Sequence, residues 1–219
     1  MKIHYAIQGS PEWLAIRKGK PSASRFKDIV TAVKCELSKS HDAYIDTLIA
    51  QTFVPDWDEC PFPSYWMKRG TEMEPQARLA FQAHYEAQAG KVDVQTVGFV
   101  LHDNNVLGCS PDSLIAMDGK HVAGLEIKCP APNTHVAWVR AGGLPDEHKQ
   151  QVHGSMIVTG LPVWHFWSYY PGMKPHHVIV HRDDYTAKME KALLEFCDIY
   201  RREFAKARAS LELAGEGRE

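Results

Sequence analysis

The chain of 219 residues lacks an apolar run of the ~18 residues that a membrane-spanning helix needs. Its first residues also lack the apolar stretch of a secretory signal. Its five cysteines form no CxxC pair, which disfavours a disulfide framework or a zinc site. An excess of either charge is missing too, because 25 basic and 27 acidic side chains leave a net charge of −2. We therefore expect a soluble, cytoplasmic protein whose overall charge indicates no particular partner.

The composition is that of an ordinary globular protein, with 44% hydrophobic and 24% charged residues. A chain of this length forms one domain, or at most two small ones, and buries a sizeable core. Basic residues concentrate in one place, since residues 13–34 contain six basic side chains and one acidic one. From charge alone, a solvated helical surface explains that segment.

Helix and strand signals occur in blocks along the chain. Helical spacing and capping residues predict helices over 11–18, from Ser22 onward, and over 43–53, 64–88, 133–140, 147–158 and 185–209. We expect Pro75 to break the fourth of these and residues 54–63 to form a loop. Short β-prone runs predict strands over 96–101, 106–109, 113–117, 121–129, 163–170 and 177–181, with a hairpin turn at Asp118-Gly119.

This order of elements predicts an α/β or α+β fold in which helices flank a small central mixed β-sheet. We expect a single domain over 1–219. Its parts are a helical N-terminal region over about 10–90, a sheet core over about 96–181 and a C-terminal helix over about 185–209.

One pair of segments contains the groups that a metal-dependent hydrolase needs. Ser110-Pro111-Asp112 is followed, after thirteen residues, by Glu126, Ile127 and Lys128. Because strand side chains alternate, Glu126 and Lys128 project from the same face, and the predicted hairpin brings Asp112 beside them. Two carboxylates and a backbone carbonyl form a hard oxygen site that suits Mg²⁺ or Mn²⁺. A bare Glu-x-Lys is usually a surface ion pair, but the preceding Ser-Pro-Asp and the hairpin favour the metal site.

These residues resemble the signature of the PD-(D/E)xK nuclease superfamily, and in detail its phage lambda exonuclease branch, the viral recombinase nucleases. The similarity extends from about Trp13 to the final helix. It comprises six motifs in the family's order, namely WLAIRKGKPSAS, RGTEMEPQAR, GCSPD, LEIKCP, QVHGSM and WSYYPGM. The resemblance implies a restriction-endonuclease-like core.

The resemblance also implies the catalytic groups. Asp112, Glu126 and the backbone carbonyl of Ile127 would hold one divalent ion, and Asp112 with Glu74 would share a second. Mg²⁺ is the expected ion, with Mn²⁺ as a substitute. Lys128 would orient the attacking water. From the residues alone, Glu74 can equally form a helical i,i+4 ion pair with Arg78.

Arg17 and Ser24 fall on the family positions that contact DNA at its 5′ phosphate, and Gln151 falls on a later catalytic glutamine. The start of a helix beside a basic run suits a phosphate, although Ser22 and Ser24 can also simply cap that helix. Two features depart from the family pattern. The second glutamine of QVHGSM-like motifs is His153 here, and Asp103 is the best match for an upstream aspartate, at a spacing that is off by one.

The function that the resemblance implies is a Mg²⁺-dependent 5′→3′ exonuclease. It would digest one strand of linear double-stranded DNA to mononucleotides and leave 3′ overhangs for recombination by strand annealing. Two alternatives stay open: an endonuclease of restriction or resolvase type, and a catalytically silent DNA-binding module.

The resemblance further implies a homotrimeric ring around DNA and a single-strand annealing recombinase as partner. It places the protein in a bacterial host, encoded by a phage or prophage, with no membrane partner. The twelve histidines, including His176, His177 and His181, are expected to be structural or surface residues.

Overall fold

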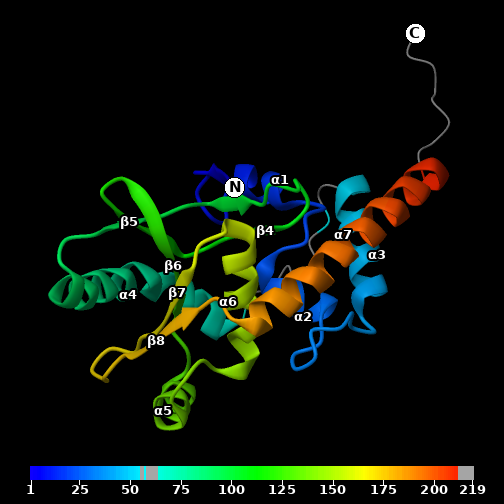
Figure 1. Cartoon of the computed structure of the whole chain (residues 1–219). Helices are drawn as coiled ribbons and strands as arrows, with labels where there is room; N and C mark the ends of the chain where they lie inside the picture. Colours follow the sequence, from blue (N-terminus) through cyan, green and yellow to red (C-terminus); the bar gives the residue numbers. More distant parts are fainter. Residues whose placement is uncertain (55–56, 58–63, 212–219) are drawn as a thin grey trace.

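A mixed five-stranded sheet lies at the centre of the computed structural model, which describes residues 1–54, 57 and 64–211 (Figure 1). Its strand order is β2-β5-β6-β7-β8. The strands are β2 (Asp93–Gln95), β5 (Ser113–Met117), β6 (Lys120–Lys128), β7 (Val163–Ser168) and β8 (His176–His181). Only β6 and β7 are parallel, and the connection between them contains α5 (Pro132–Ala141) and α6 (Asp146–Thr159). The predicted α/β fold with a small mixed sheet flanked by helices is confirmed.

A second sheet of three short strands accompanies the first, with the order β1-β3-β4. It consists of β1 (Lys2–His4), β3 (Phe99–Leu101) and β4 (Gly108–Cys109). The sequence pattern did not predict β1, because three residues are too few to show a period of two. The run 96–101 was also expected to be one strand, whereas β2 ends at Gln95 and β3 begins at Phe99.

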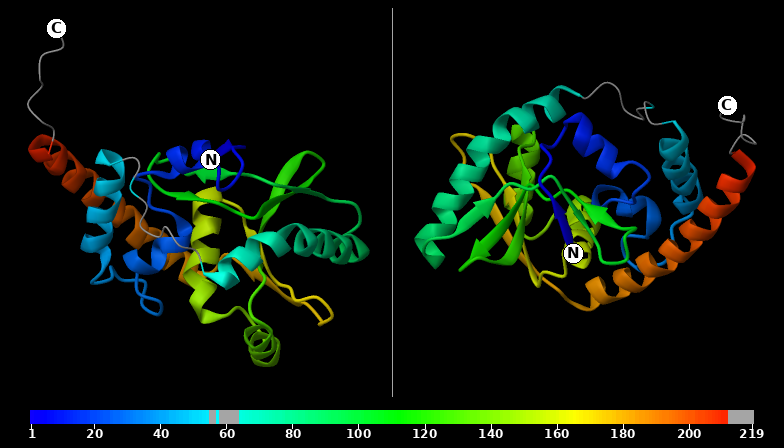
Figure 2. Two further views of the ribbon diagram at one scale, coloured as in Figure 1. Left: turned by 180° about the vertical axis from the view of Figure 1, so that it is seen from behind. Right: turned by 90° about the horizontal axis from the view of Figure 1, so that it is seen from above.

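The two faces of the central sheet are covered by different helices. Phe166 and Trp164 of β7 belong to a core that also includes side chains of α2 (Phe26–Ile29), α3 (His41–Phe53), α6 and α7 (Asp184–Leu211). Trp167 and Leu125 point to the other face, toward α4 (Tyr65–Ala89). Figure 2 shows α4 and α7 on opposite sides of the molecule. None of the helices in the described ranges is long and apolar enough to span a membrane.

Local signals set several element ends as predicted. The Ser10 hydroxyl accepts the N–H of Trp13 at 3.2 Å and begins α1 (Pro11–Arg17). Gly90 ends α4 with φ of 79°. Asp118 and Gly119 have φ of 50° and 75°, as a two-residue turn requires when both central residues are left-handed.

Two expectations about the N-terminal half are wrong. Pro75 does not break its helix, since α4 is continuous from Tyr65 to Ala89. Pro75 is exposed, so the carbonyl that it leaves without a partner faces solvent, while buried Ala77 and Phe81 hold the helix on the sheet. Ser22 precedes a short 3₁₀ turn, η1 (Ala23–Arg25), without capping it through its side chain. The predicted loop over 54–63 lies mostly outside the described residues.

Candidate active site

The start of β5 brings Asp112, the residue just before it, beside β6. Ser113, the first residue of β5, pairs with Leu125, and Asp112 precedes it. Oδ2 of Asp112 accepts the backbone N–H of Ile127 at 2.5 Å. The Asp112 carboxylate is therefore hydrogen-bonded to Ile127, the residue between Glu126 and Lys128.

Glu126 and Lys128 project from the same face of β6, as the alternation of side chains predicts. Nζ of Lys128 lies 2.5 Å from Oε1 of Glu126, whose side chain is only 3% exposed. Leu125 and Ile127 are buried on the opposite face, toward α4. The Glu-x-Lys pair is thus part of the interior of the site and not a surface ion pair.

The Ile127 carbonyl faces the same edge of β6 as Asp112. In a β-strand the N–H and C=O of one residue point toward the same neighbour, and the N–H of Ile127 points to Asp112. The strand on that side begins only at Ser113, so no ladder partner stands opposite Ile127. The Lys128 carbonyl points the other way and accepts the N–H of Tyr169 at 2.8 Å.

Glu74 approaches this group from α4, and the ion pair predicted for it is present while its role as a metal ligand stays a prediction. Glu74 forms an i,i+4 ion pair with Arg78. Arg78 in turn donates to the Asp112 carbonyl at 3.2 Å and to the Ser113 hydroxyl at 2.9 Å. Burial, and then the charge of Asp112, raise the pKa of Glu74. Arg78 therefore ties α4 to the start of β5, a role that the sequence pattern did not predict.

The electrostatics of the three acids favour a cation. Burial raises the pKa of Glu126 to about 7, which Lys128 opposes and Asp112 reinforces. Burial likewise raises the pKa of Asp112. Burial alone would lower the pKa of Lys128, but Glu126 and Asp112 raise it. Among the described residues, Lys128 and Arg78 are the cations beside the three acids, which leaves an excess of negative charge that a divalent ion would stabilise.

The donor set also fits such an ion. Each acid uses one oxygen for protein contacts: Oδ2 of Asp112, Oε1 of Glu126 and Oε1 of Glu74. Within the described part of the chain, their second oxygens make no protein hydrogen bond. Together with the Ile127 carbonyl they form an all-oxygen set of the kind that Mg²⁺ and Mn²⁺ take. Among the same residues no three His, Cys, Asp or Glu groups are arranged to hold an ion, so the acid side chains would have to rotate to share one.

Gln151 and His153 of α6 point to different parts of the molecule. Nε2 of Gln151 donates to Oε1 of Glu126 at 2.6 Å, so this glutamine reaches the acids. His153 is buried and contacts the Thr186 hydroxyl on α7 at 2.7 Å. The histidine that replaces the family's second glutamine therefore joins two helices, outside the group of acids.

Arg17 and Ser24 meet through Ser22. Nη2 of Arg17 donates to the Ser22 hydroxyl at 3.4 Å, and that hydroxyl lies 3.2 Å from the hydroxyl of Ser24. The Arg17 guanidinium stacks over Trp13 at 4.1 Å, and burial lowers its pKa. No carboxylate in the described ranges pairs with it. A largely buried, unpaired guanidinium beside two hydroxyls is suited to an anion.

A short segment connects this cationic group to the acids. The N–H of Gly108 donates to the Pro21 carbonyl at 2.9 Å, and Ser22 forms a bridge with Gly108. Four residues later the same segment ends in Asp112. Gly108 cannot carry a side chain, because a Cβ would lie 2.0 Å from the Phe99 ring. Between the two groups, the buried hydroxyl of Ser110 has no hydrogen-bond partner.

The structure does not bring Asp103 to this site, and the expectation that it is a ligand there is corrected. Asp103 lies in the turn after β3 with an 83% exposed side chain, and it pairs with the N-terminal ammonium at 2.5 Å. The neighbouring residues form a tight turn in which the side chain of Asn104 accepts the N–H of Val106 at 2.9 Å. Asp103 therefore faces solvent.

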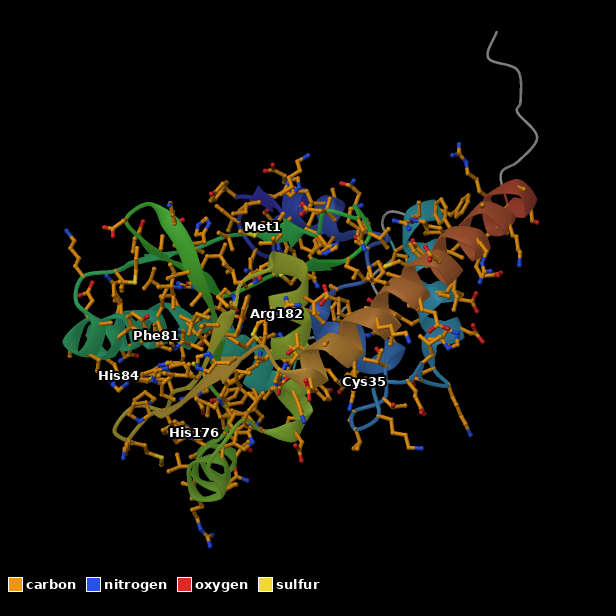
Figure 3. All side chains as sticks on the ribbon, in the orientation of Figure 1. Met1, Cys35, Phe81, His84, His176 and Arg182 are labelled. Carbon is orange, nitrogen blue, oxygen red and sulfur yellow. The ribbon has the colours of Figure 1, made fainter. Side chains whose placement is uncertain are left out.

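Several histidines form a separate chain on the α4 face. Phe81 and His84, labelled in Figure 3, project from α4 toward β8. His84 lies 3.2 Å from His177, whose other ring nitrogen lies 2.9 Å from His165. Burial lowers the pKa of His165 and of His177 to about 4. His176 points away from them and contacts the Gly143 carbonyl at 2.7 Å.

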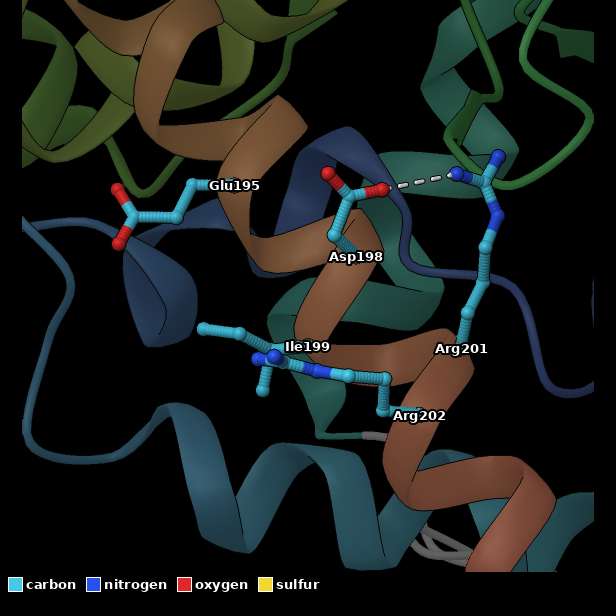
Figure 4. Close-up of a pocket in the computed structure, with 5 residues that line it drawn as sticks. All are labelled: Glu195, Asp198, Ile199, Arg201 and Arg202. Carbon is cyan, nitrogen blue, oxygen red and sulfur yellow. Dashed lines mark hydrogen bonds and ion pairs between the residues drawn. The ribbon is translucent and has the colours of Figure 1, made fainter.

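A hollow along α7 is unrelated to this chemistry. Its lining is Glu195, Asp198, Ile199, Arg201 and Arg202 (Figure 4). Asp198 and Arg201 pair with each other at 3.1 Å, and Arg201 also donates to the Asn104 carbonyl at 3.0 Å.

Comparisons with known proteins show the family of the chain and solved structures with a similar fold. Residues 12–162 match the family model described as the YqaJ-like viral recombinase domain. The alkaline exonuclease LHK-Exo from Laribacter hongkongensis, for which one of two similar structures is a complex with dAMP, is 29% identical, with a TM-score of 0.74 over 92% of this chain and 97% of that one. A phage-related exonuclease from Haemophilus somnus 129PT shares the fold at 11% identity, with a TM-score of 0.60 over 85% of this chain and 95% of that one. No curated protein sequence matches the chain.

Proposed function

Because the chain belongs to the YqaJ-like viral recombinase family, we propose that it is a divalent-metal-dependent exonuclease acting on linear double-stranded DNA. It would digest one strand from 5′ to 3′ and release mononucleotides. The observation that carries the proposal is the hydrogen bond from Ile127 to Asp112, which joins Asp112 to the Glu126–Lys128 pair.

The residues that would hold the metal are Asp112, Glu126, Glu74 and the Ile127 carbonyl. When bound, Mg²⁺, or Mn²⁺ in its place, lowers the pKa of water and offsets charge on the phosphate, and we propose two ions per site. The Lys128 ammonium, held by Glu126, would position the attacking water and stabilise the negative charge that develops on the phosphate. Gln151 would keep one oxygen of Glu126 in place.

The cationic group formed by Arg17, Ser22 and Ser24 favours an exonuclease over an endonuclease. A terminal phosphate carries more negative charge than one within a strand, and the fork of an arginine matches its oxygens. The buried Ser110 hydroxyl, which has no hydrogen-bond partner, lies on the segment that connects this cationic group to Asp112. A silent DNA-binding module is disfavoured, since it has no need of Asp112, Glu126 and Lys128 together.

The assembly and the biological setting are part of the same proposal. We propose a homotrimeric ring around DNA and a single-strand annealing recombinase that takes over the 3′ overhang. Both are supported by the family membership alone. The setting would be the cytoplasm of a bacterial host, with the gene carried by a phage or prophage.

Digestion of end-labelled DNA tests the proposed activity. Linear duplex labelled at its 5′ ends should release labelled mononucleotide with Mg²⁺, and none with a chelator. Covalently closed circular DNA should stay intact. Cutting of the circle would favour the endonuclease, and the absence of any cutting with Mg²⁺ or Mn²⁺ would favour the silent module.

A further inference from the structure

Arg69 begins the motif RGTEMEPQAR, of which the proposed function uses Glu74. It lies near the start of α4, in a row with Met73 and Ala77 at intervals of four residues. Met73 and Ala77 pack in the core between α4 and the sheet. Side chains four residues apart lie on the same side of a helix, so Arg69 also projects toward the sheet, one turn closer to the start of α4.

The contacts of Arg69 place it next to the end of β6. Nη1 of Arg69 donates to the Cys129 carbonyl at 3.4 Å, and Cys129 directly follows Lys128, the last residue of β6. The Arg69 guanidinium also lies over the ring of Tyr170, with Cζ 4.7 Å from the ring centre. Tyr170 follows Tyr169, whose N–H donates to the Lys128 carbonyl at 2.8 Å. Both contacts therefore hold Arg69 beside the immediate neighbours of Lys128.

The positive charge of Arg69 is not neutralised by a protein acid. In the part of the chain that the structure describes, no carboxylate forms an ion pair with Arg69, and its Nε and Nη2 donate to no protein group. The side chain is half-buried, so part of it faces solvent. The ring of Trp66 lies 5.8 Å from Cζ and that of Tyr170 4.7 Å away, which restricts the orientation of the guanidinium. A planar fork held in this way, with free donors, suits the oxygens of a phosphate.

Arg69 and the cationic group of Arg17, Ser22 and Ser24 approach the acids from different elements. The cationic group is joined to Asp112 by the segment that precedes β5, whereas Arg69 contacts the residue that follows β6. The core beside η1 lies on the α6 face of the sheet, and α4 covers the other face. Two phosphates of one DNA molecule would therefore be needed to occupy both places.

We propose that Arg69 binds an internal backbone phosphate of the DNA, separate from the 5′-terminal phosphate assigned to Arg17. This inference rests on the proposed function of the site. A contact of this kind fixes the position of the DNA on the protein and carries no sequence preference. Arg69 would thus help to hold the duplex in place while Lys128 and the acids act on the strand.

Binding of a 5′-phosphorylated duplex tests the proposal, measured by fluorescence anisotropy in the Lys128→Ala background with Mg²⁺. Adding Arg69→Gln should weaken binding about ten- to a hundredfold, the effect of one charge-assisted contact. It should also lower the slope of log Kd against log salt by about one, because one phosphate fewer is neutralised. Lys91→Gln is the matched control, since it removes the same charge from an exposed position beyond the other end of α4 and should change neither quantity.

Duplexes with a single uncharged methylphosphonate locate the contact. Replacement of the phosphate that Arg69 holds should weaken binding when Arg69 is present and have no further effect in Arg69→Gln. Arg17→Ala should leave that internal position sensitive. The proposal is overturned if Arg69→Gln removes sensitivity at no internal position, or if it removes only the preference for a 5′-phosphate end.

Kinetics separate phosphate binding from a purely structural role. Arg69 would bind the DNA equally before and during hydrolysis, so Arg69→Gln should raise KM and leave kcat near its original value. If Arg69 only held the Cys129 carbonyl, its loss would displace Lys128 and lower kcat, with the affinity for duplex and the salt slope unchanged. That result in a folded Arg69→Gln protein would overturn the proposal.

Two further variants keep the test decisive if Arg69→Gln does not fold. Arg69→Lys keeps the charge without the fork, and should retain the salt slope while losing part of the affinity. Tyr170→Leu removes the stacking partner but no charge, and should weaken binding less than Arg69→Gln with the slope unchanged. Full affinity in both would overturn the proposal. If the unmodified protein binds duplex but never digests it, the proposed nuclease function fails, and the binding comparison still decides the role of Arg69.

Discussion

The backbone N–H of Ile127 donates to the carboxylate of Asp112 at 2.5 Å, so the residue between Glu126 and Lys128 holds the acid from the neighbouring segment. This bond forms because β5 begins two residues too late to pair with Ile127. The carbonyl of Ile127 points to the same edge, which gives the acids a fourth oxygen without any further side chain.

Replacement of Lys128 should separate hydrolysis from binding. Lys128→Ala removes the ammonium but no proposed metal ligand, so we expect a loss of roughly a hundred- to a thousandfold in kcat. Binding of DNA and of Mn²⁺ should persist, as measured by fluorescence anisotropy and calorimetry. Digestion by Lys128→Ala at a rate near that of the unmodified protein would show that the active site is assigned wrongly.

Replacement of Asp112 should lower the affinity of the protein for its metal ion. Asp112→Asn keeps an oxygen that can accept the Ile127 N–H, so the loop stays in place while the ligand charge is lost. We expect a clear fall in Mn²⁺ affinity by calorimetry, together with loss of activity. Asp103→Asn is the matched control, because Asp103 is 83% exposed and outside the site. Equal Mn²⁺ affinity in the protein and in Asp112→Asn would remove Asp112 from the ligand set.

Replacement of Arg17 should remove the preference for one kind of DNA end. A hydrogen bond to a charged group contributes roughly 1.5–3 kcal/mol, which corresponds to about a ten- to a hundredfold effect on rate. We expect slow digestion of 5′-hydroxyl ends by the unmodified protein, and no difference between the two end types in Arg17→Ala.

Lys20→Ala serves as the control in this experiment, since it removes a nearby basic residue that the structure does not place in the cationic group. If Arg17 were only part of a general basic surface, Arg17→Ala would instead weaken binding of both end types equally, and in a salt-dependent way. Equal rates on both end types for the unmodified protein would exclude the anchor.

The histidine chain on the α4 face should make the fold sensitive to acid. Burial lowers the pKa of His165 and of His177 to about 4, below the ordinary value of 6.5 that these groups regain on unfolding. Their uncharged forms therefore stabilise the fold above pH 6.5, and this contribution is lost as the pH falls from 6.5 toward 4. We expect Tm to fall between pH 7 and pH 5, and His177→Phe to reduce that fall. A pH dependence that is the same in His177→Phe would assign it to other groups.

The local part of the site was predictable from the sequence. The alternation of strand side chains placed Glu126 with Lys128, and the Asp118-Gly119 turn, with two left-handed residues, folded β5 back onto β6. These features depend on spacing and turn chemistry, which a single sequence carries.

Contacts between distant elements were not predictable in the same way. For Arg78 the sequence predicted only an i,i+4 ion pair with Glu74. The structure adds hydrogen bonds to Asp112 and Ser113, more than thirty residues away. Pro75 carried a strong breaking signal that packing of Ala77 and Phe81 on the sheet overrides. The contact between Gln151 and Glu126 follows from how α6 lies on the sheet, and no periodicity shows that.

The segment from Gly108 to Asp112 is fixed at both ends, by Pro21 at one and by Ile127 at the other. Proline at position 111 restricts its backbone further. In the proposed nuclease, such a segment would set the distance between Arg17, where the 5′ phosphate would bind, and Asp112, where the strand would be cut. Its length, and not the chemistry of the acids, would set how much of the strand leaves in each cycle, and one inserted residue would change the size of the product.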